Sequence, residues 1–400
     1  MKNDHLARRN VAILAVCQAL LNSTLTISIS LGGLVGFNLA SDKSLATLPV
    51  TAVVTGTAIA TIPASMLMKR IGRRAGFSVG TLIGVAGALL AALAIAQVDF
   101  WLFCLSMLLV GSFSAFGQYY RFAAADVASD SFRPRAISLV MAGGVVAGFL
   151  GPQIAKWTKD LVPDALFLGC YVAAAGLCLV ALVLLQGINI PRPTAMELKL
   201  PERPLGRVMR QPTFVVAACS AMIAYAMMNL LMTATPLAMV GHHHSTDDAL
   251  TVIQWHVIGM FAPSFVTGGL IQRFGVLTII LAGVALNLLA ISIALSGTGW
   301  LHFLVALTLL GIGWNFMFVG GTTLLTSTHN AVEKAKTQAA NDFMVFGAVA
   351  TASLLSGHLL HHFGWETINW AAAPFILASG ALVVWYLLGR RAAARASAAD

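Results

Sequence analysis

The sequence predicts an all-α membrane protein with twelve transmembrane helices, and three observations support this. Of the 400 residues, 58% are hydrophobic and only 10% are charged, whereas a soluble domain has about 25% charged residues. Apolar runs recur along the chain, each near the length of about 20 residues that one bilayer crossing needs. The net charge of +9 is expected in cytoplasmic loops, so it does not indicate nucleic acid binding.

Twelve apolar runs are expected to cross the bilayer. They lie near residues 11–37, 47–68, 77–97, 101–121, 136–156, 166–187, 213–239, 250–271, 276–296, 302–326, 340–360 and 368–388. With a cytoplasmic N-terminus, only three of the 24 Lys and Arg residues fall on the outer side, namely Lys43, Lys156 and Lys159. Because cytoplasmic loops are enriched in Lys and Arg, this asymmetry predicts that both termini are cytoplasmic.

The longest predicted loop divides the twelve spans into two sets of six. Residues 188–212 contain several prolines and alternating charges, which is typical of a linker. We therefore predict an N-terminal six-helix half at 1–187, a cytoplasmic linker at 188–212 and a C-terminal six-helix half at 213–400.

A short basic motif follows the second span and is partly repeated after the eighth. Arg70 and Gly72 have counterparts 203 positions later in Arg273 and Gly275. Together with Arg73 and Arg74, they resemble the signature loop of the major facilitator superfamily, whose fold consists of two six-helix repeats. The resemblance implies that this loop gates conformational change. Ser65 and Lys69 depart from the motif, and Lys69 replaces an aspartate that would normally make a charge pairing.

Two neighbouring spans carry a methionine and histidine pattern. Met228 and Met232 are four positions apart in the seventh span, and His256 and Met260 are four apart in the eighth. Residues at i and i+4 share a helix face, and a short loop joins the two spans, so the faces are predicted to meet. Thioether and imidazole ligands suit monovalent copper, and the pattern therefore predicts a metal site.

The wider context of these four residues resembles one transporter family. Met-x-x-x-Met, then Gln-Trp-His-x-x-x-Met and Phe-Ala-Pro-Ser-Phe, are similar to the motifs of the CcoA-like copper importers of proteobacteria. The resemblance implies a monomeric carrier in the bacterial inner membrane that imports copper by alternating access. Copper would be the substrate rather than a cofactor, and copper chaperones for cytochrome oxidase assembly would act downstream. Relatives in the same family resemble riboflavin importers, so the likeness alone does not choose the substrate.

The loop between the seventh and eighth spans is rich in metal-binding residue types. It contains three consecutive histidines and two carboxylates, His242, His243, His244, Asp247 and Asp248. These residues are expected either to collect a metal cation on the outer side or to form an ordinary polar loop.

Two further functions remain open. An importer of a small organic molecule such as riboflavin would use aromatic side chains to stack a planar ring, and the candidates are Phe113, Phe116, Tyr119, Tyr120, Trp255 and Trp314. A membrane copper sensor or chaperone would bind metal without transporting it. The sequence has neither a GxxxxGK[ST] motif nor a recognisable catalytic motif, and we expect neither an ATP-driven pump nor an enzyme.

Overall fold

The computed structural model describes residues 2–42, 45, 48–190 and 202–396, and the regular elements of this part of the chain are helices. These helices form two compact units. Unit 1 comprises Met1–Ala195 and Gln338–Phe343, and unit 2 comprises Met196–Thr337 and Met344–Asp400. The predicted domain boundaries stay a prediction, because residues 191–201 of the linker lie outside the described residues.

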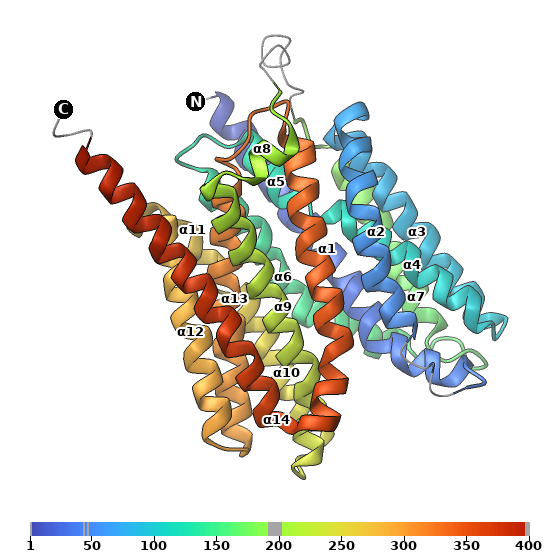
Figure 1. Ribbon diagram of the computed structural model, residues 1–400. Coiled ribbons are helices and arrows are strands. Elements are labelled where there is room, and N and C mark those ends of the chain that lie inside the picture. Colours follow the sequence, from blue (N-terminus) through green and yellow to red (C-terminus); the bar gives the residue numbers. More distant parts are fainter. Residues whose placement is uncertain (1, 43–44, 46–47, 191–201, 397–400) are drawn as a thin grey trace. The chain divides into compact units, whose positions relative to one another are not determined.

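The bounds of the helices in unit 1 agree approximately with those of the first six predicted spans (Figure 1). They are α1 (Lys2–Leu39), α2 (Leu48–Ile71), α3 (Arg73–Ala96), α4 (Phe100–Gly117), α5 (Tyr120–Val127), α6 (Arg133–Thr158) and α7 (Leu168–Leu185). The fourth predicted span corresponds to α4 followed closely by the short helix α5. α2 packs against α4 and α1 against α6.

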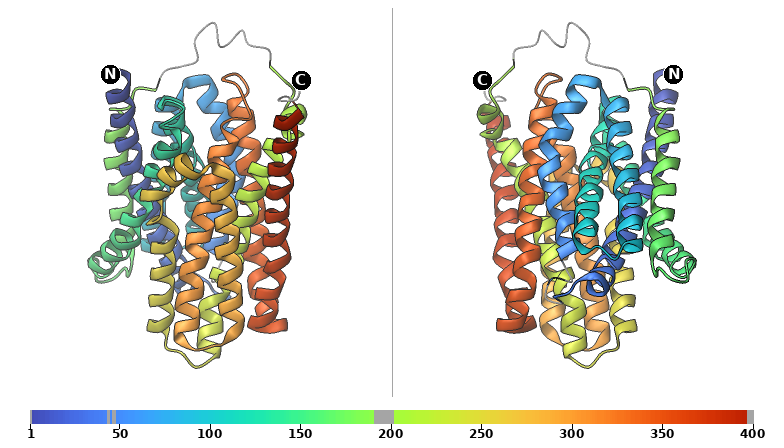
Figure 2. Two further views of the ribbon diagram at one scale, coloured as in Figure 1. Left: turned by 90° about the vertical axis from the view of Figure 1, so that its left-hand side faces the viewer. Right: turned by 90° about the vertical axis from the view of Figure 1, so that its right-hand side faces the viewer.

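Unit 2 contains the remaining helices. They are α8 (Leu205–Met209), α9 (Pro212–Gly241), α10 (Thr246–Phe261), α11 (Ser264–Phe274), α12 (Val276–Ser296), α13 (Trp300–Leu325) and α14 (Lys334–Ala396). α12 and α13 lie side by side (Figure 2), and α9 and α10 each pack mainly against α13. The element α14 is two helices joined at Gly364, where φ is 79°, and Figure 1 shows the chain reversing there from orange to red.

Ten helical stretches of the described residues are long and apolar enough to cross a membrane. The predicted eighth span at 250–271 corresponds to α10 and α11, which are 16 and 11 residues long and meet at Ala262 and Pro263. Both of these residues keep right-handed helical backbone angles. The span is therefore bent rather than interrupted there, because Pro263 has no backbone N–H to continue the hydrogen-bond ladder. The predicted spans 340–360 and 368–388 are the two parts of α14.

The same close helix crossing occurs once in each unit. In unit 1, a Cβ on Gly56 would lie 2.2 Å from the carbonyl oxygen of Leu108, and one on Gly111 would lie 2.1 Å from that of Val53. In unit 2, a Cβ on Gly259 would lie 2.6 Å from the carbonyl oxygen of Thr308, and one on Gly311 the same distance from that of His256. Glycine lets the two backbones touch at each crossing.

The two crossings also correspond in sequence. Val53 and Gly56 in α2 lie 203 positions before His256 and Gly259 in α10. On the partner helices, Leu108 and Gly111 lie 200 positions before Thr308 and Gly311. α2 with α4 is therefore the counterpart of α10 and α11 with α13, and the crossing in unit 1 provides an internal reference for the crossing in unit 2.

The repeated basic motif has the same backbone conformation in both units. Gly72 has φ 90° and ψ 164°, and Gly275 has φ 86° and ψ 149°. Residues that carry a Cβ atom are strongly disfavoured in this region of φ and ψ. The requirement for glycine at both turns is therefore conformational.

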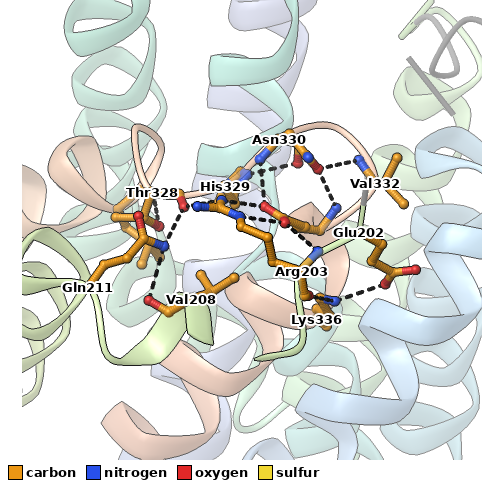
Figure 3. A network of polar contacts seen from close by, with 11 residues as sticks. Glu202, Arg203, Val208, Gln211, Thr328, His329, Asn330, Val332 and Lys336 are labelled. Carbon is orange, nitrogen blue, oxygen red and sulfur yellow. Dashed lines mark hydrogen bonds and ion pairs between the residues drawn. The ribbon is translucent and has the colours of Figure 1, made fainter. Parts of the chain in front are cut away.

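A polar network fixes the end of the linker to the loop between α13 and α14 (Figure 3). Arg203 donates three hydrogen bonds to the Glu333 carboxylate, through its backbone N–H and its guanidinium, and a fourth to the carbonyl of Thr328. Asn330 N–H also donates to Glu333, whose side chain is fully buried. Beside them, Lys336 pairs with Glu202. We call this set the linker clamp, and its residues lie before α8, in the loop between α13 and α14, and in the first turn of α14.

Candidate functional site

Five aromatic rings from four helices of unit 2 form a cluster. Tyr225 of α9 makes edge contacts with the rings of Trp314, Phe318 and Phe346, at centroid distances of 5.2, 5.3 and 5.7 Å. Trp314 stacks on Phe318 at 5.0 Å with an interplanar angle of 13°, and Phe261 meets Trp314 edge-on at 5.8 Å. Trp314 and Phe318 are each 1% exposed, whereas Tyr225 and Phe261 are partly exposed, so the partly exposed rings rest on a buried aromatic base.

The indole N–H of Trp314 is notable within this aromatic cluster. Trp314 is only 1% exposed, and its Nε1 has no hydrogen-bond partner among the described residues. A buried indole usually finds an acceptor. The cluster therefore combines stacking surface with one unused donor.

A buried asparagine stabilises the bend between α10 and α11 next to this cluster. Asn315 of α13 donates its amide hydrogens to the carbonyl of Met260 at 2.7 Å and to the hydroxyl of Ser264. Its own side-chain oxygen accepts a hydrogen bond from Thr267 at 2.7 Å. These bonds replace helix bonds near Pro263 and fix Phe261, the last residue of α10, beside Trp314. Because Ala262 and Pro263 keep helical backbone angles, the junction is a proline kink that the asparagine stabilises.

His256 lies on α10 and is completely buried against α13. Its Nδ1 is 2.7 Å from the carbonyl oxygen of Leu307, and its Nε2 has no hydrogen-bond partner among the described residues. The predicted face-to-face meeting of the seventh and eighth spans is a minor contact, because α9 and α10 both pack mainly on α13. The histidine is anchored to α13 rather than to α9.

The four predicted copper ligands are distributed over α9 and α10. Met228 and Met260 are buried, Met232 is half-buried, and no hydrogen bond joins a thioether sulfur to the unpartnered Nε2 of His256. Within the described residues, no group of three or more His, Cys, Asp or Glu side chains is arranged to hold a metal. The copper site of three methionines and one histidine stays a prediction.

Two members of the predicted metal-capture loop have hydrogen-bond partners. His244 Nε2 donates to the carbonyl of Thr298 at 2.7 Å, and Asp248 forms a capping box with Ser245 at the start of α10. His242 and His243 are exposed, and the side chain of Asp247 lies outside the described residues. The capture role of this loop stays a prediction.

The aromatic residues proposed from sequence divide into packing residues and one cluster member. Phe113 and Phe116 lie against Gly84 and Gly80 of α3, and their rings fill the α3–α4 interface. Tyr119 and Tyr120 are also buried in unit 1, and Trp255 is half exposed. Trp314 alone belongs to the aromatic cluster of unit 2.

Sequence reasoning missed four cluster members and the asparagine beside them. Trp314 and Phe318 are four positions apart, which places them on one face of a helix, and this spacing was the available signal. Asn315, next to Trp314 in a strongly apolar helix, was a second one. Tyr225, Phe261 and Phe346 are brought to the cluster by tertiary packing, which no local spacing indicates.

The basic motif and the membrane-depth charges make specific pairs in unit 1. Arg73 forms an ion pair with Asp126 at 3.3 Å and donates to Gln338 at 2.7 Å, so this turn has charge and amide partners although Lys69 replaces the motif's aspartate. Arg121 and Asp342 pair at 2.7 Å and are almost completely buried. The remaining motif arginines lie at the surface, with Arg74 bonded to Gln186 and Arg273 over the ring of Phe274, while Arg70 is exposed.

Comparison with known proteins establishes the family. The sequence profile of the Major Facilitator Superfamily matches residues 11–260 and 217–399. The riboflavin transporter RfnT of Brucella anthropi is 46% identical over 374 residues, which cover 92% of this chain and 94% of the relative. The uncharacterized MFS-type transporter YddS of Bacillus subtilis is 27% identical over 404 residues, covering 96% of this chain and 92% of the relative.

Solved structures share the fold. The E. coli fucose:proton symporter FucP has a TM-score of 0.76 at 15% identity, covering 94% of this chain and 98% of that chain. An outward-facing bacterial homologue of the iron transporter ferroportin has a TM-score of 0.71 at 11% identity, covering 94% and 99%.

The chain belongs to the Major Facilitator Superfamily and is a multi-pass membrane transporter, not an enzyme. The predicted twelve-helix membrane fold and the resemblance to this superfamily are confirmed.

Proposed function

We propose that this transporter takes up riboflavin, or a closely similar planar heteroaromatic molecule, across the bacterial inner membrane. The observation that supports this most strongly is the 46% identity to a riboflavin transporter along 92% of the chain. This favours the organic-substrate alternative over copper import. The copper interpretation rested on four residues of α9 and α10, and the named functions of the relatives give it no support.

The aromatic cluster supports the same substrate class. A tricyclic flavin ring would pack against the partly exposed rings of Tyr225 and Phe261, with the buried Trp314 behind them. Stacking of a nucleic-acid base on an aromatic side chain contributes about 1–3 kcal/mol, which sets the scale. We propose that uptake proceeds by alternating access, with both termini in the cytoplasm and the protein acting as a monomer. The expected copper chaperone partners have no role in this proposal.

Uptake in cells tests the proposal directly. A bacterial strain that lacks riboflavin synthesis and its own transporter would express this chain, and entry of radioactive riboflavin and of radioactive copper would be measured in parallel. We expect riboflavin uptake that saturates and copper uptake equal to the empty-vector control. Copper uptake without riboflavin uptake would reverse the assignment.

A variant pair links uptake to the aromatic cluster. Trp314→Leu removes the buried ring that positions Tyr225 and Phe261, so riboflavin uptake should fall by at least tenfold, the equivalent of about 1.4 kcal/mol. Trp255→Leu changes a tryptophan of α10 that is half exposed, and uptake should stay unchanged. Membrane abundance of both variants is checked by immunoblot. If riboflavin uptake falls equally in both variants, uptake does not depend on the aromatic cluster.

A further inference from the structure

The hydrogen bond to Leu307 fixes the tautomer of His256. A carbonyl oxygen only accepts hydrogen bonds, so the ring atom 2.7 Å from it, Nδ1, carries the hydrogen. In a neutral imidazole the other nitrogen is then an unprotonated acceptor. Nε2 of His256 therefore presents a lone pair.

This lone pair is buried and unused. His256 is 0% exposed, and Nε2 has no hydrogen-bond partner among the described residues. An acceptor removed from water without a partner destabilises a protein, and such groups in native structures call for an explanation.

Unit 1 shows that the helix crossing itself does not need a histidine. Val53 occupies the equivalent position of the α2–α4 crossing and is 3% exposed. Its carbonyl oxygen is approached by Gly111 just as that of His256 is approached by Gly311. An apolar side chain satisfies this packing, so the polar ring in unit 2 is unexplained by the fold.

The position of the imidazole is also held rigidly. The contacts of Gly259 and Gly311 press α10 onto α13, and one turn later Asn315 binds the carbonyl of Met260. The helix that carries His256 ends at Phe261, whose ring contacts Trp314. The same short helix therefore supplies both a fixed acceptor and a wall of the aromatic cluster.

We propose that Nε2 of His256 accepts a hydrogen bond from an N–H or O–H group of the transported molecule and so determines its specificity. This inference rests on the proposed function. Riboflavin carries two kinds of donor, the imide N–H of its ring and the hydroxyls of its ribityl chain. Both would satisfy the lone pair that the protein leaves open, and the stacking cluster would hold the rest of the ring.

Binding to the purified protein in detergent, followed by flavin fluorescence, tests the proposal. Three probes are compared: riboflavin, its N-methyl imide derivative, and lumiflavin, which lacks the ribityl chain. His256→Val installs the residue of unit 1, and His256→Leu is a second apolar variant in case the first fails to fold. Val53→Leu is the matched control at the equivalent crossing. Monodispersity in size-exclusion chromatography establishes that each variant is folded.

We expect the effect of removing the ligand's donor to disappear when His256 is replaced. In the wild type, removing the correct donor should weaken binding about tenfold, and His256→Val should weaken riboflavin binding by the same factor. In His256→Val, removing that donor should cost nothing further, whereas Val53→Leu should discriminate as the wild type does. The donor concerned is the imide if the N-methyl probe shows this pattern, and a ribityl hydroxyl if lumiflavin does.

Three outcomes would overturn the inference. If His256→Val binds all three probes as the wild type does, the histidine contacts no donor while the proposed function stands. If the wild type itself does not bind riboflavin, the proposed function fails and the inference fails with it. If the wild type instead binds monovalent copper and His256→Val does not, the lone pair is a metal ligand.

Discussion

The helix crossings of the two units have the same glycine contacts but very different polar content. In unit 1, α2 is one helix of 24 residues that includes Pro63 without breaking, and Val53 fills the crossing. In unit 2, the equivalent stretch is bent at Pro263, and the crossing holds His256. The repeat shows which features the architecture requires, because these occur in both units. Features found only in unit 2 need another explanation.

Asn315 is a second polar residue that unit 2 has and unit 1 lacks. Its counterpart 200 positions earlier is Ala115, which is fully buried beside an unbroken helix. Asn315 has all its amide groups bonded to α10 and α11, whereas His256 leaves one nitrogen unbonded. We infer that Asn315 stabilises the bend at Pro263, whereas the open nitrogen of His256 serves the substrate as proposed above. The first role is structural and the second concerns the substrate.

Among the variants that test this difference between the units, replacement of Asn315 should lower stability and uptake the most. Asn315→Leu removes the hydrogen bond to the Met260 carbonyl, at a cost of about 1–3 kcal/mol for a buried group left unpaired, whereas the Thr267 hydroxyl can still donate to the Pro263 carbonyl. We expect a marked drop in melting temperature and loss of riboflavin uptake. The matched control is Asn287→Leu, since among the described residues the buried amide of Asn287 makes one hydrogen bond, to the Met317 sulfur. If both variants melt alike, Asn315 does not stabilise the bend.

Replacement of a turn glycine should give the next largest effect. Gly275→Ala adds a methyl group that meets no atom within 4 Å, so any loss comes from the positive φ, at about 1–3 kcal/mol. Gly269→Ala, within α11 and equally free of contacts, should instead be neutral or slightly stabilising. Thermal unfolding of both variants in detergent measures the difference. A stable Gly275→Ala protein would contradict the conformational requirement at this turn.

The sequence was sufficient for the fold because bilayer insertion leaves strong local signals. Twelve apolar runs and the repeat of Arg70 and Gly72 at Arg273 and Gly275 led to the correct superfamily. The eighth span is bent at Pro263, a residue that was visible in the sequence. Proline is often tolerated in membrane helices, as Pro63 is in α2, and only the bonds of Asn315 distinguish the two cases.

The candidate site was harder to predict because its members converge through packing. Met228, Met232, His256 and Met260 form a pattern that local spacing makes conspicuous. The aromatic cluster draws Tyr225, Phe261 and Phe346 from three different helices onto α13, and no periodicity links them. His256 was correctly singled out as unusual at membrane depth, but its anchoring to Leu307 and its free nitrogen required coordinates.

The linker clamp offers a satisfied charged group for comparison with the unsatisfied histidine. Hydrogen bonds from Arg203 hold the pKa of Glu333 at about 2, below its ordinary value of 4.5. Because the folded pKa is the lower one, the stabilisation is complete above pH 4.5 and is lost as the pH falls toward 2. Melting temperature in detergent should therefore decrease from pH 6 to pH 3, and less steeply in Glu333→Gln. Asp130→Asn, at an exposed ion pair with Arg133, should keep the wild-type slope, and a matching slope in Glu333→Gln would refute the clamp's contribution.

The smallest effect is expected in the loop between α9 and α10, which supplies exposed histidines for comparison with the buried one. Replacing His242 and His243 with Ser removes two exposed rings, and such surface changes usually alter stability by less than about 0.5 kcal/mol. Riboflavin uptake should be unchanged at every concentration, because neither ring contacts the aromatic cluster. His244→Ser, which also loses the bond to Thr298, should lower the melting temperature slightly and leave uptake intact. Weaker uptake of copper at low concentration in the double variant, with riboflavin uptake unaffected, would revive the metal-capture hypothesis for this loop and separate it from the substrate site in unit 2.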